Sequence, residues 1–226
     1  MSSTDPVYNR RGLGLLIALG VVFAAAFTLL SVYGPDFQSG SNGGAHALSP
    51  AATGYSAIVK LSSAAGLPAT LGRTEQAAQA AGLLVLTPEA GTASGEIRSL
   101  VRKRRGAPTL IILPKWQTAP LALHPGWVQS TGQLPLGAAA RMGRGLRLDL
   151  VLREGVIADG APLRDSENRG ISVPAPRFTR SIAGSNGLDA VLADAAGHMV
   201  IGWKARENLY VLVEPDLLNN KGLRTL

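Results

Sequence analysis

The chain has 226 residues, 46% of them hydrophobic and 5% aromatic, and a formal net charge of +7. Because it contains no cysteine, disulfides, thiol nucleophiles and thiolate metal sites are excluded. Because aromatic residues are few and do not interleave the basic clusters, no nucleic-acid partner is expected.

The first predicted element is an apolar run near the N-terminus. Leu13 to Val32 carries no charged residue, and about 20 apolar residues are what a helix needs to cross a bilayer core. This length favours a retained anchor over a cleaved signal peptide, whose apolar stretch has about 7 to 15 residues. Arg10 and Arg11 precede the run, which predicts a cytoplasmic N-terminus.

These features predict a single-pass membrane protein with a periplasmic domain. The expected parts are a cytoplasmic tail over 1–11, a transmembrane helix over 12–34, a flexible linker over 35–49 and one folded domain over 50–226. The linker is inferred from its Gly, Ser and Asn content. The lipid bilayer is the partner expected for Leu13 to Val32.

The domain begins with helices that alternate with apolar runs. The pattern predicts a helix over Tyr55 to Ala65, a strand over 83–87, a helix over 94–105 and a strand over 108–114. Apolar strands separated by helices are typical of a parallel sheet covered on both faces. The expected fold class is therefore α/β, with a doubly wound or flavodoxin-like layered domain.

Residues 115–176 differ in composition from the rest of the domain. Pro, Gly and Arg recur there, and the alternation from Leu146 to Arg153 predicts a half-exposed antiparallel strand. We expect a β-rich or irregular insertion at this place. Further apolar runs at 190–193, 199–203 and 209–213 predict antiparallel additions to a mostly parallel sheet.

Three segments together with the N-terminal run resemble a known bacterial family. They are SPAATGYSAIVKLSSAAGLPATL, LLVLTP, and VEPDLLNN at the end of the last predicted strand. In this order they resemble domain of unknown function 4350 over about the whole chain. The resemblance implies an amidotransferase-like α/β domain anchored in the bacterial inner membrane. It also implies a role beside MoxR-type AAA ATPases and their membrane partners.

No catalytic residue, metal or cofactor is expected. Glutamine hydrolysis on amidotransferase-like folds needs a cysteine thiolate at a strand-to-helix turn, and this chain has none. A serine nucleophile would need a base beside it, but His46, His124 and His198 are scattered over the predicted linker, an irregular segment and a turn. They also lack the spacing of metal ligands, and no complete glycine-rich phosphate loop is present.

Polar residues follow two of the predicted strands. In open α/β sheets, ligands bind beyond the carboxyl ends of strands, so these residues could hold a ligand or a partner. Capping of the following turn by Asp216 would explain the same residue types, and both interpretations stay open. The candidate ligand- or partner-binding residues are Thr87, Glu89, His124, Glu214, Asp216, Asn219 and Asn220.

A basic cluster ends the predicted helix over 94–105. It consists of Arg102, Lys103, Arg104 and Arg105. A solvated helix end, where cations meet the negative end of the helix dipole, explains it without a ligand. A patch for an anionic partner is the alternative.

Two functions are compatible with these features. The favoured one is a non-catalytic binding or scaffold domain of a MoxR-ATPase-associated membrane assembly. The alternative is a small-ligand-binding or hydrolytic domain that uses strand-end residues near Thr87, His124 and Asp216.

Overall fold

The computed structural model of the chain divides into two units, Met1–Ser39 and Gly40–Leu226. The second unit contains both hydrophobic core clusters and all of the strands given below. The structure describes residues 17–25, 27, 43–72, 78–104, 106–121, 123–124, 127–157, 161–167 and 169–224.

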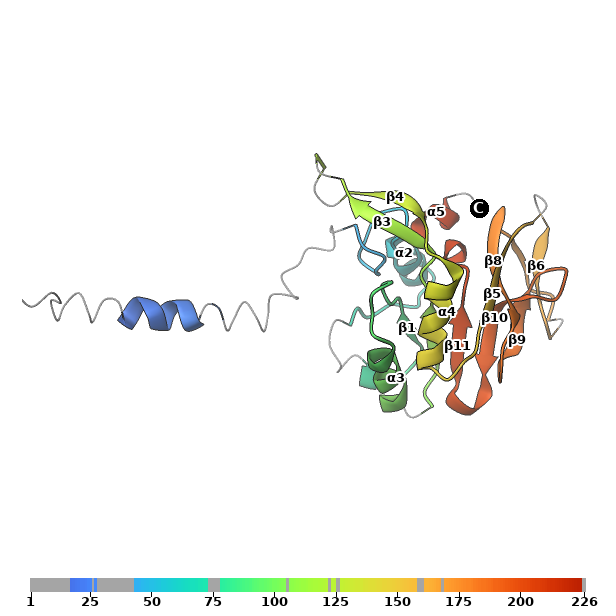
Figure 1. Cartoon of the computed structure of the whole chain (residues 1–226), viewed down its shortest axis with the longest axis horizontal. Helices are drawn as coiled ribbons and strands as arrows, with labels where there is room; N and C mark the ends of the chain where they lie inside the picture. The colour runs from blue at the N-terminus through green and yellow to red at the C-terminus, as the bar shows by residue number, and fades with distance from the viewer. Residues whose placement is uncertain are drawn as a thin grey trace, which may run out of the picture. The chain divides into compact units, whose positions relative to one another are not determined.

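The prediction of a transmembrane helix over 12–34 is wrong. The described residues of this range, 17–25 and 27, are helical (Figure 1). No helix in the described part of the chain is long and apolar enough to cross a membrane. The length of an apolar run does not by itself make a transmembrane segment, because a membrane-spanning segment must also form one long apolar helix.

The single-pass topology predicted from this helix is corrected with it. That correction covers the inner-membrane location, the cytoplasmic N-terminus and the periplasmic placement of the domain. The predicted tail, 1–11, lies outside the described residues.

The second unit is built from short helices and strands. The helices are α2 (Ser56–Ala64), α3 (Ser94–Lys103), α4 (Leu136–Gly145) and α5 (Asn220–Leu223), with 3-10 turns η2 (Ala205–Glu207) and η3 (Pro215–Leu217). The strands are β1 (Leu84–Leu86), β2 (Thr109–Ile112), β3 (Trp116–Pro120), β4 (Val128–Gln133), β5 (Val151–Val156), β6 (Pro162–Asp165), β7 (Ser172–Pro174), β8 (Phe178–Gly184), β9 (Asp189–Ala193), β10 (Met199–Lys204) and β11 (Leu209–Leu212).

Nine of the strands in the described residues form one mixed sheet. Its main path is β1-β2-β11-β10-β9-β6-β7, while β8 pairs with both β10 and β5. Within this sheet, β2 pairs in parallel with β1 and with β11, and the other described pairs are antiparallel. Strands β3 and β4 form a separate antiparallel pair.

The predicted fold class is therefore wrong. Strands outnumber helices in the described residues, the sheet is mostly antiparallel and curled, and the domain is only partly α/β (Figure 1). The physical reason is that an apolar run indicates burial on both faces but does not determine strand direction. The antiparallel pairs that the sequence suggested as additions make up most of the sheet.

Strands β2 and β11 are buried on both faces. Ile111 and Val211 belong to one core cluster, and their neighbours Ile112 and Leu212 belong to the other. This alternation follows from the two-residue period of a strand. Both strands therefore end inside the protein, and polar residues that follow them begin in a buried environment.

Helices α3 and α4 cover the first core cluster. Ile97 and Val101, four residues apart, place one face of α3 in the core, and Met142 of α4 lies in the same cluster. The two helices approach closely because Gly145 has no side chain: a Cβ atom there would collide with Ser94. The Arg and Lys residues of the last turn of α3 lie near the negative end of its dipole.

The described end of the predicted linker packs on the folded unit. Ser49 is fully buried, and its carbonyl accepts a hydrogen bond from the side chain of Asn220 at 2.8 Å. Gly54 lies so close to Ser49 that a Cβ atom would collide with its carbonyl. Residues 35–42 of the predicted linker lie outside the described part of the chain.

Candidate functional site

The ends of β2 and β11 bring together charged side chains that are far apart in the sequence. These strands are parallel neighbours, so their carboxyl ends lie at the same edge of the sheet. Lys115 follows β2, and Glu214 and Asp216 follow β11. The Nζ atom of Lys115 lies 2.8 and 2.7 Å from the two carboxylate oxygens of Glu214 and 3.1 Å from Oδ2 of Asp216.

Lys115 and Glu214 are removed from solvent. Both side chains are 0% exposed, and Nζ of Lys115 also donates to the carbonyl of Phe178 at 2.7 Å. The Glu214 carboxylate accepts from the backbone amides of Arg180 and Asp216, at 2.6 and 3.1 Å. Burial raises the pKa of Glu214, and the Lys115 ammonium opposes this rise. Each of the two buried charges thus has hydrogen-bond partners within the protein.

Asp216 connects this ion pair to the start of β3 and to α5. Its Oδ1 accepts from the indole Nε1 of Trp116 at 2.6 Å and from the side-chain amide of Asn219 at 2.7 Å. The side-chain oxygen Oδ1 of Asn219 accepts from the backbone amide of Gly222, and Asn219 thereby caps the N-terminus of α5. The ammonium of Lys221 lies 3.8 Å from the centre of the Trp116 ring, on the outer side of this group.

Arg180 and Tyr55 complete the same buried region. The guanidinium of Arg180 donates to the carbonyls of Pro114 and Leu134, and burial lowers its pKa. Burial and the nearby carboxylates raise the pKa of Tyr55, so its hydroxyl stays neutral. We call this group the strand-end cluster; it comprises Tyr55, Lys115, Trp116, Arg180, Glu214, Asp216 and Asn219.

Three of the predicted site residues, Glu214, Asp216 and Asn219, thus belong to the strand-end cluster. Asn220, which follows the cluster, accepts from the amide of Ala57 and donates to the carbonyls of Ser49 and Ala51. These contacts hold the C-terminal segment against the start of α2. The described caps are made by Glu214, which accepts from the Asp216 amide at the start of η3, and by Asn219 at the start of α5.

The other three candidates do not join the cluster through any described contact. Thr87 is half-buried and Glu89 is exposed in the loop after β1. His124 is exposed in the connection between β3 and β4, where its ring centre lies 5.5 Å from that of Trp127. The described hydrogen-bond partners of the Asp216 side chain are Lys115, Trp116 and Asn219.

The basic cluster after α3 does not form one exposed patch. Arg104 is buried, with 6% of its surface exposed, and donates to the carbonyls of residues 78, 80, 82 and 108. Arg102 and Lys103 are exposed, and Arg105 lies outside the described residues. Arg104 therefore holds the chain segment before β1 against the start of β2.

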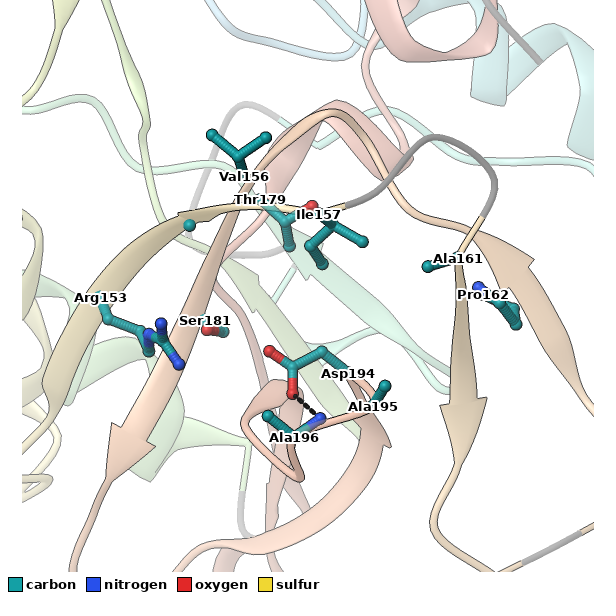
Figure 2. A pocket seen from close by; sticks show the side chains of 11 residues that line it. Arg153, Val156, Ile157, Ala161, Pro162, Thr179, Ser181, Asp194, Ala195 and Ala196 are labelled. Atoms are coloured by element: carbon teal, nitrogen blue, oxygen red, sulfur yellow. Dashed lines mark hydrogen bonds between the residues drawn. The ribbon is translucent and has the colours of Figure 1, made fainter.

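A cavity that the sequence did not indicate lies beside β5 and β8. Figure 2 shows side chains that line it, and its volume is about 200 Å³. Strand pairing places Arg153 of β5 directly opposite Ser181 of β8, and the turn from β9 to β10 brings Asp194 to the same space. The lining residues are Arg153, Gly155, Val156, Ile157, Ala161, Pro162, Thr179, Ser181, Asp194, Ala195 and Ala196.

His198 joins Arg153 to Asp194 at the edge of this cavity. Its Nδ1 lies 3.1 Å from Oδ2 of Asp194, and Nη1 of Arg153 lies 2.8 Å from each ring nitrogen. Both ring nitrogens of His198 therefore have described contacts.

No protein-family model, curated protein or solved structure matches the chain. Within the described residues, no group of three or more His, Asp or Glu side chains is arranged to hold a metal ion. The strand-end cluster supports the fold through its hydrogen bonds, whereas the cavity is lined by the polar side chains of Arg153, Ser181 and Asp194.

Sequence reasoning had only a weak signal for this cavity. The alternating pattern around Arg153 indicated a half-exposed strand. This pattern does not pair β5 with β8. That pairing places Arg153 and Ser181 side by side although they lie far apart in the sequence.

Proposed function

We propose that the folded unit is a non-catalytic binding domain of a protein assembly, with the β3–β4 hairpin as its contact surface. The observation that carries this proposal is the exposure of large apolar side chains at the hairpin end. Leu123 is 87% exposed and Trp127 is 65% exposed. Exposed Trp side chains are frequent anchors in protein interfaces because they bury a large area at a small cost in conformational entropy.

The hairpin is held in a defined position at its base. Trp116, the first residue of β3, donates to Asp216, and the carbonyl of Lys115 accepts from the amide of Leu134 after β4. Figure 1 shows β3 and β4 as a separate pair at the same end of the unit as α5. The buried cluster thus fixes the base of the hairpin, while its far end presents apolar surface.

Three described residues at the end of the hairpin contact one another. The amide of Trp127 donates to the carbonyl of His124 at 3.0 Å, and the amide of Leu121 donates to the carbonyl of Trp127 at 2.9 Å. The rings of His124 and Trp127 stack at a tilt of 39°. A contact surface ordered before binding loses less conformational entropy when a partner binds.

The closed strand-end cluster supports a binding role over catalysis at the sheet edge. Open α/β sheets bind substrates beyond their strand ends, but here that place is filled by the protein's own ion pairs. We propose a partner protein with an apolar cleft that accepts Trp127 and Leu123. The resemblance to domain of unknown function 4350 makes a MoxR-type ATPase system the first partner to test.

Affinity capture of the intact protein from its native cells, followed by mass spectrometry, tests the proposal. Three forms are compared: the unchanged chain, Trp127→Ser, and the control Phe178→Ser, which alters another exposed aromatic residue. We expect the same specific proteins with the unchanged chain and the control, and their loss with Trp127→Ser. Equal recovery by all three forms, or no specific protein with any of them, would contradict the proposal.

A further inference from the structure

The cavity beside β5 and β8 carries an inference that is independent of the hairpin. We propose that it binds a small aliphatic carboxylate, whose oxygens accept hydrogen bonds from the guanidinium of Arg153 and the hydroxyl of Ser181. Figure 2 shows Arg153, Ser181 and Asp194 pointing toward the same space. Val156, Ile157, Ala161 and Pro162 form an apolar part of the lining.

Arg153 carries a charge that no carboxylate neutralises directly in the described structure. Its described side-chain contact is the ring of His198, which Nη1 approaches to 2.8 Å. A guanidinium has five N–H donors in a planar fork, so most of them stay available for a ligand. A carboxylate is the anion whose two oxygens match that fork.

Asp194 does not repel such a ligand as a free carboxylate would. Its Oδ1 accepts from the backbone amides of Ala196 and His198, both at 2.9 Å, and its carboxylate also contacts the ring of His198. These contacts close the turn between β9 and β10. They also place the positive ends of two amide dipoles at Oδ1 of Asp194.

Ser181 supplies a second donor from the floor of the cavity. The residue is 3% exposed, and among the described residues its hydroxyl has no hydrogen-bond partner although it lines the cavity. The neighbouring Thr179 differs, because its hydroxyl already donates to the carbonyl of Pro176. A hydroxyl that lines the cavity and makes no described hydrogen bond can donate to a ligand oxygen.

The size of the cavity limits the ligand. Its volume of about 200 Å³ suits a ligand of a few non-hydrogen atoms. A branched short-chain carboxylate such as isovalerate has this size. Its carboxylate would meet Arg153 and Ser181, and its alkyl part would meet Ile157 and Pro162.

Titration of the isotope-labelled full chain with isovalerate, followed by amide NMR spectra, tests the proposal. Isovaleramide is the matched control ligand because it has the same shape and no charge. We expect saturable shifts at Gly155, Ser181 and Ala196 with isovalerate. Affinity for isovaleramide should be at least about tenfold lower, because a charge-assisted hydrogen bond is replaced by a neutral one.

Protein variants separate specific binding from general attraction of anions. Arg153→Gln should weaken isovalerate binding about tenfold or more, and Ser181→Ala about threefold, whereas Arg141→Gln on the exposed face of α4 should leave it unchanged. The thermal midpoint of each variant shows that it is folded. Equal binding of isovaleramide, unchanged binding by Arg153→Gln, tighter binding of inorganic phosphate, or shifts confined to other residues would each overturn the proposal.

Discussion

Lys115 joins the ends of two parallel strands through one buried ammonium. Its partners are Glu214, Asp216 and the carbonyl of Phe178. An ion pair of this kind is not by itself a strong source of stability, because both charges lose their hydration. Removal of one partner destabilises the protein, because the remaining charge stays buried and unpaired.

We therefore expect Lys115→Met to lower the free energy of unfolding by about 3–5 kcal/mol. Urea denaturation at neutral pH measures this change. The control is Lys60→Met, which alters an exposed lysine of α2 and should change stability by less than about 0.5 kcal/mol.

The loss of unfolding free energy in Lys115→Met should become smaller as the pH falls. Without the ammonium the pKa of Glu214 rises further, and the native state then binds more protons than the unfolded state. A loss below about 1 kcal/mol for Lys115→Met would contradict the expectation.

Asp165 predicts a second pH dependence, of opposite sign. Hydrogen bonds from the side chain of Arg169, at 3.1 Å, lower the pKa of Asp165 to about 2, and the backbone amides of Glu167 and Arg169 act in the same direction. Its contribution to stability is present above the unfolded pKa of about 3.9 and is lost as the pH falls toward 2. A carboxyl NMR titration should show a higher pKa for Asp165 in Arg169→Gln. Arg164→Gln, on the exposed side of β6, should leave that pKa unchanged.

The residues of the strand-end cluster were only partly predictable. Glu214 and Asp216 were found because they follow an apolar strand. Lys115 was not, since its partner lies 99 residues away and only the pairing of β2 with β11 brings them together. The same limit applies to Arg153 and Ser181 in the cavity.

At the scale of elements, Arg104 connects one helix to the edge of the sheet. It follows α3 directly, and its guanidinium donates to the carbonyls of residues 78, 80, 82 and 108. The sequence suggested an exposed cation at this position because its neighbours in the cluster are charged. Exposure of a helix end depends on which other segments pack against it, and the spacing of charged residues in the sequence does not predict those segments.

We expect Arg104→Gln to loosen the segment from residue 78 to the end of β1. Amide hydrogen exchange of residues 78–86 should become about tenfold faster or more, because the carbonyl contacts that hold the segment are lost. Arg102→Gln, an exposed change in the last turn of α3, is the control and should leave exchange unaltered. Similar exchange in both variants would show that Arg104 does not hold the segment.

At the scale of the whole molecule, the second unit contains its own core. The members of both core clusters lie between residues 45 and 218, on the two faces of β2 and β11. No member lies in the unit Met1–Ser39. Burial of apolar surface is the main favourable contribution to folding, so stability should depend on the second unit.

Removal of residues 1–39 should therefore leave the thermal midpoint within about 2 °C of the full chain, a shift that corresponds to less than about 1 kcal/mol in a domain of this size. Circular dichroism melting curves of both forms measure it. A chain with Ile111→Ala serves as the positive control, because loss of a fully buried side chain costs about 2–5 kcal/mol. A drop of about 4 °C or more on truncation would contradict the prediction.

The sequence by itself determined the local features of this protein. It indicated the apolar strands that enter the core, the amphipathic helix α3, and the acidic and amide residues after the last strand, since local patterns and propensities encode these. Only the tertiary structure decided the direction of the strands, the partners of Lys115 and Arg104, and the pairing that brings Ser181 beside Arg153. Each of these depends on contacts between residues distant in the chain, and hydrophobic composition alone is compatible with more than one arrangement.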